Sequence, residues 1–552
     1  MLRRCVIARP WHPCSGHLCG YGPHRGSGPH RGSGPHRGSG PHRGSGHGLR
    51  GLKSTSPSAL ESKLKTLEDL RGPSFMGTLY WLFVKGYFQH AQLLQVEHSK
   101  IWGPLWKSTF GPLRLVNVSS AELIEQVLRQ DGRHPVRTDM PHWRSYRELR
   151  NKAYGPLTEM GPKWHNIRSI LNPRLLKPKH VTSYTDAIND VVTDFIHKLS
   201  RLRNTTGEQE SAVVHNLADE LYKFAFEGIC SVLFETRIGC MDENIPEETQ
   251  RFIVSVGEMM QLSQVVIIFP RSLWPYLPFY RKFVAAWDHL FKVAEALIQK
   301  KMDEIERQAD LEQNIDGAYL THLLLSQKMT VEEILGSVTE LLLAGVDTTS
   351  NTLCWALYHL AREPEIQEQL HQEVSHVCPG GRMPTSDDMA WMPFTKAVVK
   401  ETLRMYPSIP GNARICVDKE VIVGDHLFPK NTMFHLCHYA ASYDKRIFPR
   451  PHSFQPQRWL RGAEQKLHPF GSIPFGFGVR ACLGRRVAEL EMYLLLTRLI
   501  QRFEVRPDPA GTEVTPITRT LLCPGKPVNL QFLDRTPDAQ RSSSANETAT
   551  HS

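Results

Sequence analysis

The feature that most constrains the fold is the stretch 330–362, which the sequence predicts to be one long helix. It begins with Thr330-Val-Glu-Glu, where Thr330 and Glu333 form a capping-box pattern, and it stops before Pro364. At about 1.5 Å per residue, such a helix is on the order of 45 Å long. Its middle is apolar on every side, so we expect it to be buried. The sequence therefore predicts a large, mainly helical domain that this helix crosses.

Composition narrows the class of protein. Of 552 residues, 41% are hydrophobic and 22% charged, which is typical of a globular chain. The net charge of +10 belongs to residues 1–60, which contain nine Lys or Arg and no acid, so it does not indicate nucleic-acid binding. Eleven Cys without a CxxC pair favour neither a disulfide scaffold nor a zinc site. No apolar run reaches the length of a membrane span.

Three segments are expected. Residues 1–59 are Arg-rich and acid-free, which is typical of a mitochondrial transit peptide. They contain four Gly-Pro-His-Arg-Gly-Ser copies, expected to be disordered, with metal binding as the weaker alternative. Residues 60–535 have no linker and are expected to form one domain, with strands at 113–118 and a hairpin within 420–436. Residues 536–552 are expected to be a disordered tail.

The strongest chemical signal is the loop Phe475-Gly-Phe-Gly-Val-Arg-Ala-Cys-Leu-Gly. It places Cys482 directly before a predicted helix at 485–503, whose N-terminus favours a thiolate. The glycines allow close approach of a large flat group, and Arg480 is placed to meet a carboxylate. A lone Cys is usually a buried core residue, so the surrounding motifs decide.

The loop resembles the haem-binding loop of the cytochrome P450 superfamily, whose Cys supplies the axial thiolate. Four other motifs of the superfamily lie at the family's spacing, including Glu-x-x-Arg and a Trp-x-x-x-Arg helix. The resemblance implies a mainly α fold with small β-sheets, a single large domain and haem b as cofactor. The residues that carry it are Trp164, Arg168, Ala344, Asp347, Thr348, Glu401, Arg404, Arg458, Phe475, Gly478, Arg480, Cys482 and Gly484.

The resemblance also implies roles. Cys482 is the expected iron ligand, and Asp347 with Thr348 are expected to deliver protons to bound oxygen. The alternative for this pair is a Thr bonded back to its helix and an Asp at a kink. Glu401, Arg404 and Arg458 are expected to form a structural ion network. The residues expected to contact haem are Trp164, Arg168, Ala344, Arg414, Phe475, Arg480 and Cys482.

Arg414 rests on weaker grounds, because its only support is its position ten residues after Arg404. A surface salt bridge is the alternative for it. His165, beside Trp164, is not included among the expected site residues.

Mitochondrial members of the superfamily receive electrons from a small acidic ferredoxin and its NADPH-dependent reductase. Lys396 and Lys400, together with Arg486, match the basic face that docks it; an ordinary solvated helix face is the alternative. We expect peripheral contact with the matrix side of the inner mitochondrial membrane. The aromatic, proline-broken segment 265–280 is equally consistent with core burial and with the membrane interface.

Within the superfamily the chain looks most like the mitochondrial sterol 26-hydroxylase group, notably at 134–140, 343–353 and 478–492. This resemblance implies hydroxylation of sterol side chains, including cholesterol and bile-acid precursors, with O2 and electrons from ferredoxin. A vitamin D hydroxylase or a retinoid hydroxylase or desaturase is the alternative, and residues 140–147 lean towards the desaturase. A haem-thiolate isomerase or sensor without a reductant is an alternative of another class.

Overall fold

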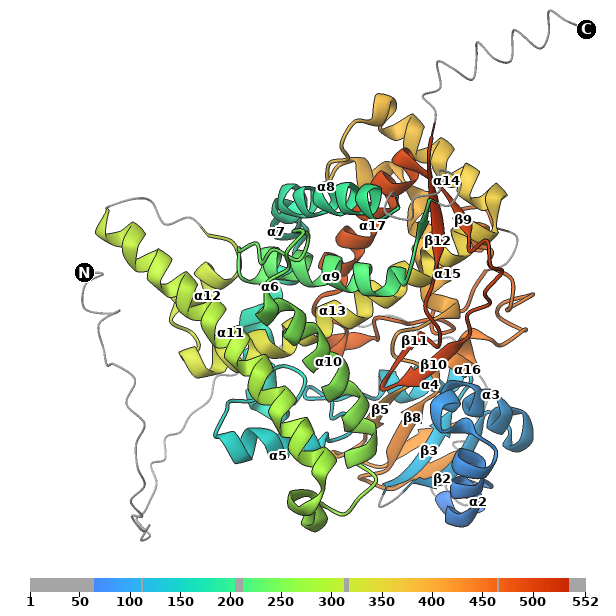
Figure 1. Cartoon of the computed structure of the whole chain (residues 1–552). Coiled ribbons are helices and arrows are strands. Elements are labelled where there is room, and N and C mark those ends of the chain that lie inside the picture. Colours follow the sequence, from blue (N-terminus) through green and yellow to red (C-terminus); the bar gives the residue numbers. More distant parts are fainter. Residues whose placement is uncertain (1–63, 111–112, 204–211, 312–316, 464–465, 536–552) are drawn as a thin grey trace, which may run out of the picture. The chain divides into compact units, whose positions relative to one another are not determined.

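The computed structural model describes residues 64–110, 113–203, 212–311, 317–463 and 466–535. The predicted transit peptide with its repeat, and the predicted C-terminal tail, lie outside these residues. The described chain from Lys65 onward forms one compact unit that is mainly helical (Figure 1). No helix among the described residues is long and apolar enough to cross a membrane.

The α-helices have the following bounds. They are α2 (Phe75–Leu79), α3 (Ala91–Trp102), α4 (Ala121–Arg129), α5 (Pro141–Arg150), α6 (Gly161–Leu176), α7 (Pro178–Val181), α8 (Thr185–Leu202), α9 (Leu217–Leu233), α10 (Glu247–Val266), α11 (Pro278–Asp310), α12 (Leu320–Ser326), α13 (Val331–Arg362), α14 (Pro364–Val377), α15 (Pro393–Met405), α16 (His438–Ser442) and α17 (Arg485–Arg502).

The long helix predicted from the sequence is α13, with 32 residues. Its first turn is capped reciprocally: the backbone N–H of Glu333 donates to Thr330 Oγ1 (3.2 Å), and that of Thr330 donates to Glu333 Oε2 (3.0 Å). Most of its residues are buried, among α9, α11, α15 and α17. At Gly345 a Cβ atom would lie 2.8 Å from Ile229 Cγ1, so glycine allows α9 to pack closely against the middle of α13.

The strands form four small sheets. A four-stranded sheet has the order β2-β3-β8-β5, two three-stranded sheets have the orders β1-β7-β6 and β4-β12-β9, and β10 pairs with β11. The bounds are β1 (Lys65–Thr66), β2 (Leu105–Phe110), β3 (Leu113–Val118), β4 (Val213–Val214), β5 (Asn412–Ile415), β6 (Val421–Val423), β7 (His426–Phe428), β8 (Met433–Leu436), β9 (Phe503–Pro507), β10 (Pro516–Arg519), β11 (Leu521–Pro524) and β12 (Leu530–Asp534).

The strand at 113–118 is confirmed, but the hairpin prediction at 420–436 is correct only for its first part. β6 and β7 pair in an antiparallel hairpin around Gly424, whose φ is +62°. β8 instead joins the four-stranded sheet, parallel to β3 and antiparallel to β5. Asn431, with φ +65°, turns the chain between β7 and β8, which redirects the third strand.

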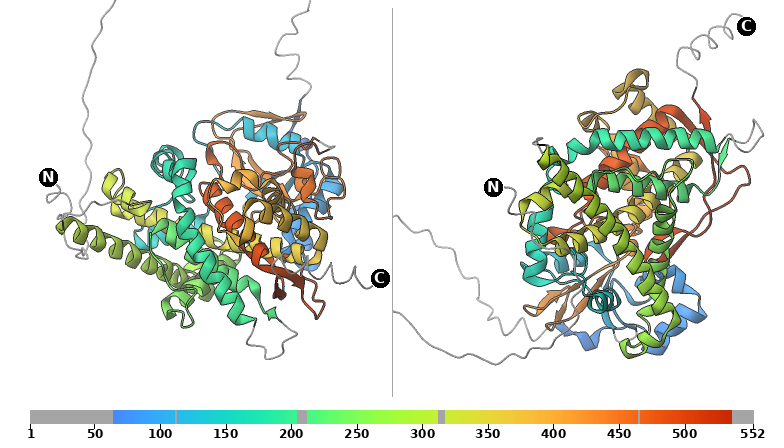
Figure 2. Two further views of the ribbon diagram at one scale, coloured as in Figure 1. Left: turned by 90° about the horizontal axis from the view of Figure 1, so that it is seen from above. Right: turned by 60° about the vertical axis from the view of Figure 1, so that its left-hand side comes forward.

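Two main hydrophobic cores, and a third cluster of only three buried residues, support these elements in the described part of the chain. The larger one lies among the helices around α13, and the smaller one joins the β3–β8 region to α4 and the β6–β7 hairpin. The views in Figure 2 separate the helices coloured green to yellow from the side that carries the blue and orange strands. The predicted haem-binding loop, 475–484, contributes residues to both cores, because Phe475 packs against the larger core and Phe477 against the smaller.

Candidate active site

The cysteine loop is held by its own backbone. The N–H of Cys482 donates to the carbonyl oxygen of Phe475 (2.8 Å), which closes the loop before α17 begins at Arg485. Gly476 and Gly478 have φ of +73° and +71°, a region that residues with a Cβ adopt at a cost. The helix predicted at 485–503 is therefore confirmed to within one residue, and the loop brings Cys482 to its N-terminus.

The thiol of Cys482 is exposed, although protein surrounds it on most sides. Burial raises the pKa of this thiol, while the Gly484 N–H and the cations Arg168, Arg137 and Arg485 lower it. Burial has the larger effect, so the pKa of Cys482 lies above its ordinary value, and the helix N-terminus and these cations offset only part of that rise.

Four arginines surround this loop, three of them buried and one half-buried. Arg480 lies with its guanidinium 3.9 Å from the ring centre of Trp164, and its Nε donates to the Pro135 carbonyl (3.0 Å). Nη2 of Arg168 donates to the Ala481 carbonyl (2.9 Å). The structure thus brings together three residues predicted to contact haem, Trp164, Arg168 and Arg480, in direct contact with the cysteine loop.

Arg414 belongs to the same cluster. Its Nε donates to Asp131 Oδ2 (2.8 Å), and the pair is almost fully buried. The salt bridge considered as an alternative from the sequence is therefore present, but it is not at the surface. Burial raises the pKa of Asp131, and Arg414 opposes that rise.

The fourth arginine, Arg137, was not among the residues predicted for the site. Its Nη2 donates to the Arg480 carbonyl (2.6 Å), and burial together with Arg414 and Arg168 lowers its pKa to about 10. The segment 134–140 was recognised in the sequence as part of the family resemblance, but Arg137 within it was not singled out. No characteristic spacing to another motif residue distinguishes this arginine from one at the surface.

This cluster has the chemistry of a receptor for carboxylates. Among the described residues, Arg137 Nε and Trp164 Nε1 are buried without a hydrogen-bond partner. Among the described residues, Asp131 acts electrostatically on three of these guanidinium groups, those of Arg137, Arg414 and Arg480. The pKa of Arg480 is nevertheless lowered to about 9, by burial and by its cationic neighbours. Unpaired buried donors of this kind are costly unless a ligand satisfies them. The residues present therefore fit a group that carries two carboxylates, as haem does.

The second part of the site is the centre of α13. Thr348 Oγ1 donates to the Ala344 carbonyl (2.8 Å), which is the helix-bonded arrangement considered as the alternative. Asp347 is half-buried, and the loss of solvent around its carboxyl raises its pKa to about 6. Its Oδ1 accepts a hydrogen bond from the hydroxyl of Tyr222 on α9, while Oδ2 has no partner among the described residues. Tyr222 had no signal in the sequence, since it lies 125 positions from Asp347.

The predicted ion network is complete. Glu401 is fully buried and accepts hydrogen bonds from Arg404 Nε (2.9 Å) and Nη2 (2.8 Å) and from Arg458 Nε (3.1 Å). Trp459 Nε1 (2.8 Å) and the Gln455 backbone N–H (3.0 Å) donate to the same carboxylate. This network ties α15 to the segment that precedes the cysteine loop.

The basic residues predicted for docking are placed on two neighbouring helices. Lys400 is exposed and Lys396 half-buried on α15, and Arg486 is exposed on α17. None of them forms an ion pair within the described part of the chain, whereas the adjacent Arg485 pairs with Glu489 (3.0 Å). Free cations on packed helices (α15 and α17 are in contact) are available to an external acidic partner.

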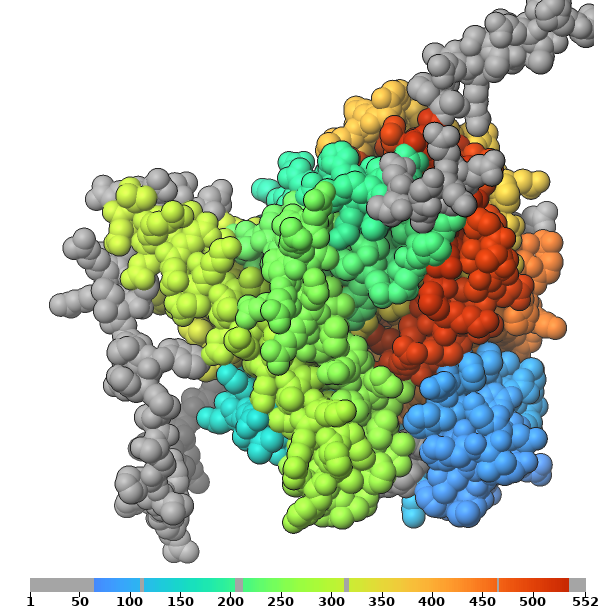
Figure 3. All heavy atoms as spheres, in the orientation of Figure 1, coloured from blue at the N-terminus to red at the C-terminus, as the bar shows by residue number. Residues whose placement is uncertain are grey.

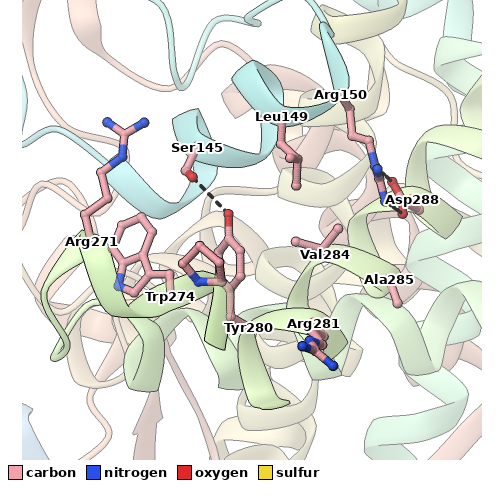
Figure 4. Close-up of a pocket in the computed structure, with 11 residues that line it drawn as sticks. Ser145, Leu149, Arg150, Arg271, Trp274, Tyr280, Arg281, Val284, Ala285 and Asp288 are labelled. Carbon is pink, nitrogen blue, oxygen red and sulfur yellow. Dashed lines mark hydrogen bonds and ion pairs between the residues drawn. The ribbon is translucent and has the colours of Figure 1, made fainter. Parts of the chain in front are cut away.

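Part of the aromatic segment 265–280 is buried in the core, and part of it is exposed at the surface. Trp274 and Tyr280 are buried, whereas Leu273 and Tyr276 are exposed, the latter at 79%. The segment borders a cavity of about 540 Å³ between α5, the short helix η6 (Arg271–Tyr276) and the start of α11 (Figure 4). Ser145 and Tyr280 meet there at 2.9 Å, and Arg150 pairs with Asp288 at 2.7 Å.

Comparison with known proteins identifies the family. The Cytochrome P450 profile matches residues 71–532. The chain belongs to the cytochrome P450 family. It is accordingly a haem-thiolate monooxygenase, and the predicted fold, enzyme class and cofactor are confirmed.

Individual relatives refine this result. Sterol 26-hydroxylase, mitochondrial, from Rattus norvegicus is 47% identical over 86% of this chain and 90% of its own length. The Homo sapiens protein of that name is 45% identical over 89% and 96%. A 25-hydroxyvitamin D-1 alpha hydroxylase from Homo sapiens is 42% identical over 86% and 94%. The crystal structure of the cytochrome P450DA heme domain superposes with a TM-score of 0.70 at 21% identity, covering 84% of this chain and 98% of that one, and supports the fold alone.

Proposed function

We propose that this cytochrome P450 is a mitochondrial monooxygenase that hydroxylates the side chain of sterols, using O2 and electrons from a ferredoxin. The observation that carries the proposal is the 45–47% identity to sterol 26-hydroxylases over 90–96% of their length. The vitamin D hydroxylases are similar at 42% or less, which makes a vitamin D substrate the second candidate.

Haem b supplies O2 activation when it is bound through a thiolate. In this chain Cys482 is the proposed ligand, and its loop supplies the glycines and the helix N-terminus that favour the thiolate. Arg168, Arg414 and Arg480 are the proposed partners of the haem carboxylates, to which the structure adds Arg137. Trp164, Phe475 and Ala344 complete the proposed contacts.

Asp347 and Thr348 are proposed to move protons within the dry centre of α13. Because the Thr348 hydroxyl donates its own proton to Ala344, its lone pairs remain as acceptors. A water or a protonated carboxyl can therefore donate to Thr348 without breaking the helix. Asp347, with a pKa raised to about 6, exchanges its proton near neutral pH, as a proton-transfer group requires.

Electron delivery is proposed to occur at the basic face formed by Lys396, Lys400 and Arg486. These side chains are free of acidic partners within the described residues, and a small acidic ferredoxin, reduced by its NADPH-dependent reductase, complements them. Opposite charges raise association rates and make them sensitive to salt. The intact Asp347–Thr348 pair and this face both favour a reductant-dependent oxygenase over an isomerase or a sensor.

Peripheral contact with the matrix side of the inner mitochondrial membrane is proposed from exposed apolar side chains. Phe75, Met76 and Phe83 lie exposed on α2 and the adjoining η3 (Tyr80–Val84), and Leu273 and Tyr276 on η6. In Figure 3 the N-terminal elements (blue) and the elements around η6 (green) reach the same end of the molecule. Both surfaces suit insertion at the interface, where a lipophilic sterol is available.

The test is reconstitution of the purified holoenzyme with ferredoxin, its reductase and NADPH, followed by mass spectrometry of products. The substrate panel contains C27 sterols, vitamin D3 and retinol. We expect side-chain hydroxysterols as the main products, formed only with both protein partners and NADPH. Preferred turnover of vitamin D3 or retinol would replace the sterol assignment, and product formation without NADPH would refute the monooxygenase role.

A further inference from the structure

The carboxyl of Asp347 is held by a single side chain. The Tyr222 hydroxyl, on α9, donates to Oδ1, and burial raises the pKa of Tyr222 well above its ordinary value, so the phenol keeps the proton that it donates. Oδ2 is buried and has no partner in the described part of the chain. The two oxygens of one carboxylate therefore have different surroundings.

The hydrogen bond joins two helices that approach closely. Ile229 of α9 lies so near Gly345 of α13 that a Cβ at position 345 would be 2.8 Å away. Two side chains of α13, Ser350 Oγ (3.2 Å) and Asn351 Nδ2 (2.7 Å), donate to the Asp347 backbone carbonyl. These contacts hold the backbone at Asp347 in place. The hydrogen bond from Tyr222 therefore determines the orientation of the Asp347 carboxyl group.

Few other titratable groups act on this carboxyl. Cys523 on β11 interacts electrostatically with both Asp347 and Tyr222, and burial raises its pKa to about 11, so it is neutral. From α17, Glu491 interacts with the neighbouring Thr349 and not with Asp347. Among the described residues, no charged group shifts the pKa of Asp347, and the hydrogen bond from Tyr222 is the one contact that opposes the effect of burial.

We propose that Tyr222 is the positioning residue of the proton-delivery pair: it holds Oδ1 of Asp347 against α9 and leaves Oδ2 as the atom that accepts and releases protons. This rests on the proposed function, since it assigns a partner to the residue that delivers protons there. The only bond that changes on Asp347 is the O–H bond at Oδ2, which forms when a proton arrives and breaks when it leaves, while Tyr222 keeps its own proton.

Removal of the phenol hydroxyl has a defined consequence. A hydrogen bond to a charged group stabilises that form enough to move its pKa by about one to two units. Tyr222→Phe should therefore shift the pKa of Asp347 upward by about that amount and free the carboxyl to rotate. With the carboxyl misplaced, the ratio of product formed to NADPH consumed should fall by roughly tenfold, with the excess electrons appearing as hydrogen peroxide.

The experiment is an infrared pH titration of the purified holoprotein, independent of turnover. The carboxyl stretch of Asp347 is isolated as the difference between the parent protein and Asp347→Asn. We expect a midpoint near the pKa of about 6 in the parent and a higher midpoint in Tyr222→Phe. Tyr319→Phe is the control, because Tyr319 is a buried tyrosine whose hydroxyl has no hydrogen-bond partner within the described residues. The midpoint of this variant should equal that of the parent.

The outcomes separate the two proposals. If Asp347→Asn keeps the parent's ratio of product to NADPH, the proton-delivery role of Asp347 is wrong. If that variant uncouples the enzyme but Tyr222→Phe retains the parent's midpoint and product ratio, Tyr222 is a packing residue and this proposal is overturned. Thermal unfolding gives a second readout. The stability that Tyr222→Phe loses relative to the parent should increase as pH rises from 5 to 8. A difference in stability that does not change with pH would also overturn the proposal.

Discussion

Glu491 on α17 allows a quantitative test of how burial in this protein changes the pKa of a carboxyl group and, through it, the stability of the fold. The side chain is 1% exposed, burial raises its pKa to about 8, and the nearby Thr349 opposes that rise only in part. A Cβ at Gly228 of α9 would lie 2.9 Å from Glu491 Oε1, so α9 closes the space on that side. The folded protein therefore keeps this carboxyl protonated at neutral pH, while the unfolded chain ionises it.

The sign of the effect follows from proton binding. Because the folded pKa lies above the unfolded value, the stabilising contribution is fully present below the unfolded pKa of about 4.5 and is lost as pH rises through the folded pKa of about 8. Each pH unit in that window changes the free energy of unfolding by about 1.4 kcal/mol. Between pH 5.5 and pH 8 the parent protein should lose about 3 kcal/mol through this group alone.

Glu491→Gln keeps the shape of the side chain and removes its titration. We expect the variant to be close to the parent at pH 5.5 and more stable than the parent at pH 8, by a change in relative stability of about 3 kcal/mol. The assay is urea unfolding of the holoprotein at both pH values, followed by circular dichroism. Other titrating groups, including Asp347, are common to both proteins and cancel in the difference.

Glu489→Gln is the matched control on the same helix. Glu489 pairs with Arg485 near the surface, so its loss should cost no more than about 1 kcal/mol at either pH. If the parent and Glu491→Gln lose stability in parallel between pH 5.5 and pH 8, Glu491 is ionised in the folded protein and the reasoning from burial is wrong.

Three further substitutions test the remaining parts of the site. Cys482→His should retain some haem but lose the red-shifted carbon monoxide band of the reduced protein that thiolate ligation produces; persistence of the band would exclude Cys482 as ligand. Lys396→Gln combined with Lys400→Gln should lower ferredoxin-driven turnover about tenfold and abolish its salt dependence, with peroxide-driven turnover unchanged, whereas equal losses under both regimes would indicate a folding defect. Glu401→Gln should destabilise the protein by about 3–5 kcal/mol in urea unfolding, because it leaves Arg404 buried without its counter-charge, and a cost below about 1 kcal/mol would contradict the network.

Local patterns predicted the elements that depend on neighbouring residues. The capping box of α13 involves residues three apart, and the Glu401–Arg404 pair lies within one helical turn. Both can therefore be recognised from a few neighbouring residues of the sequence. The cysteine loop is similar, because its glycines and Cys482 are adjacent. The capping box and the Glu401–Arg404 pair were predicted correctly in position and partner, and the helix after the cysteine loop was predicted correctly in position.

The contacts between distant segments were not predictable in the same way. Asp131 reaches Arg414 across 283 positions, and Tyr222 reaches Asp347 across 125. Neither pair has a characteristic spacing, because the packing of whole helices and sheets sets the distance between them. The hydroxyl of Thr348 bonds back to α13, which is a choice of rotamer that composition does not determine.

The arginine cluster has a consequence for how the cell makes this protein. Arg137, Arg168, Arg414 and Arg480 lie close enough together for their positive charges to repel one another, which destabilises the folded chain. A ligand that carries two carboxylates would offset that repulsion, so the chain with haem bound should resist unfolding better than the same chain without haem. By mass action, a chain without haem would then unfold and be degraded more readily, and the amount of folded enzyme would depend on the supply of haem as well as on synthesis of the chain.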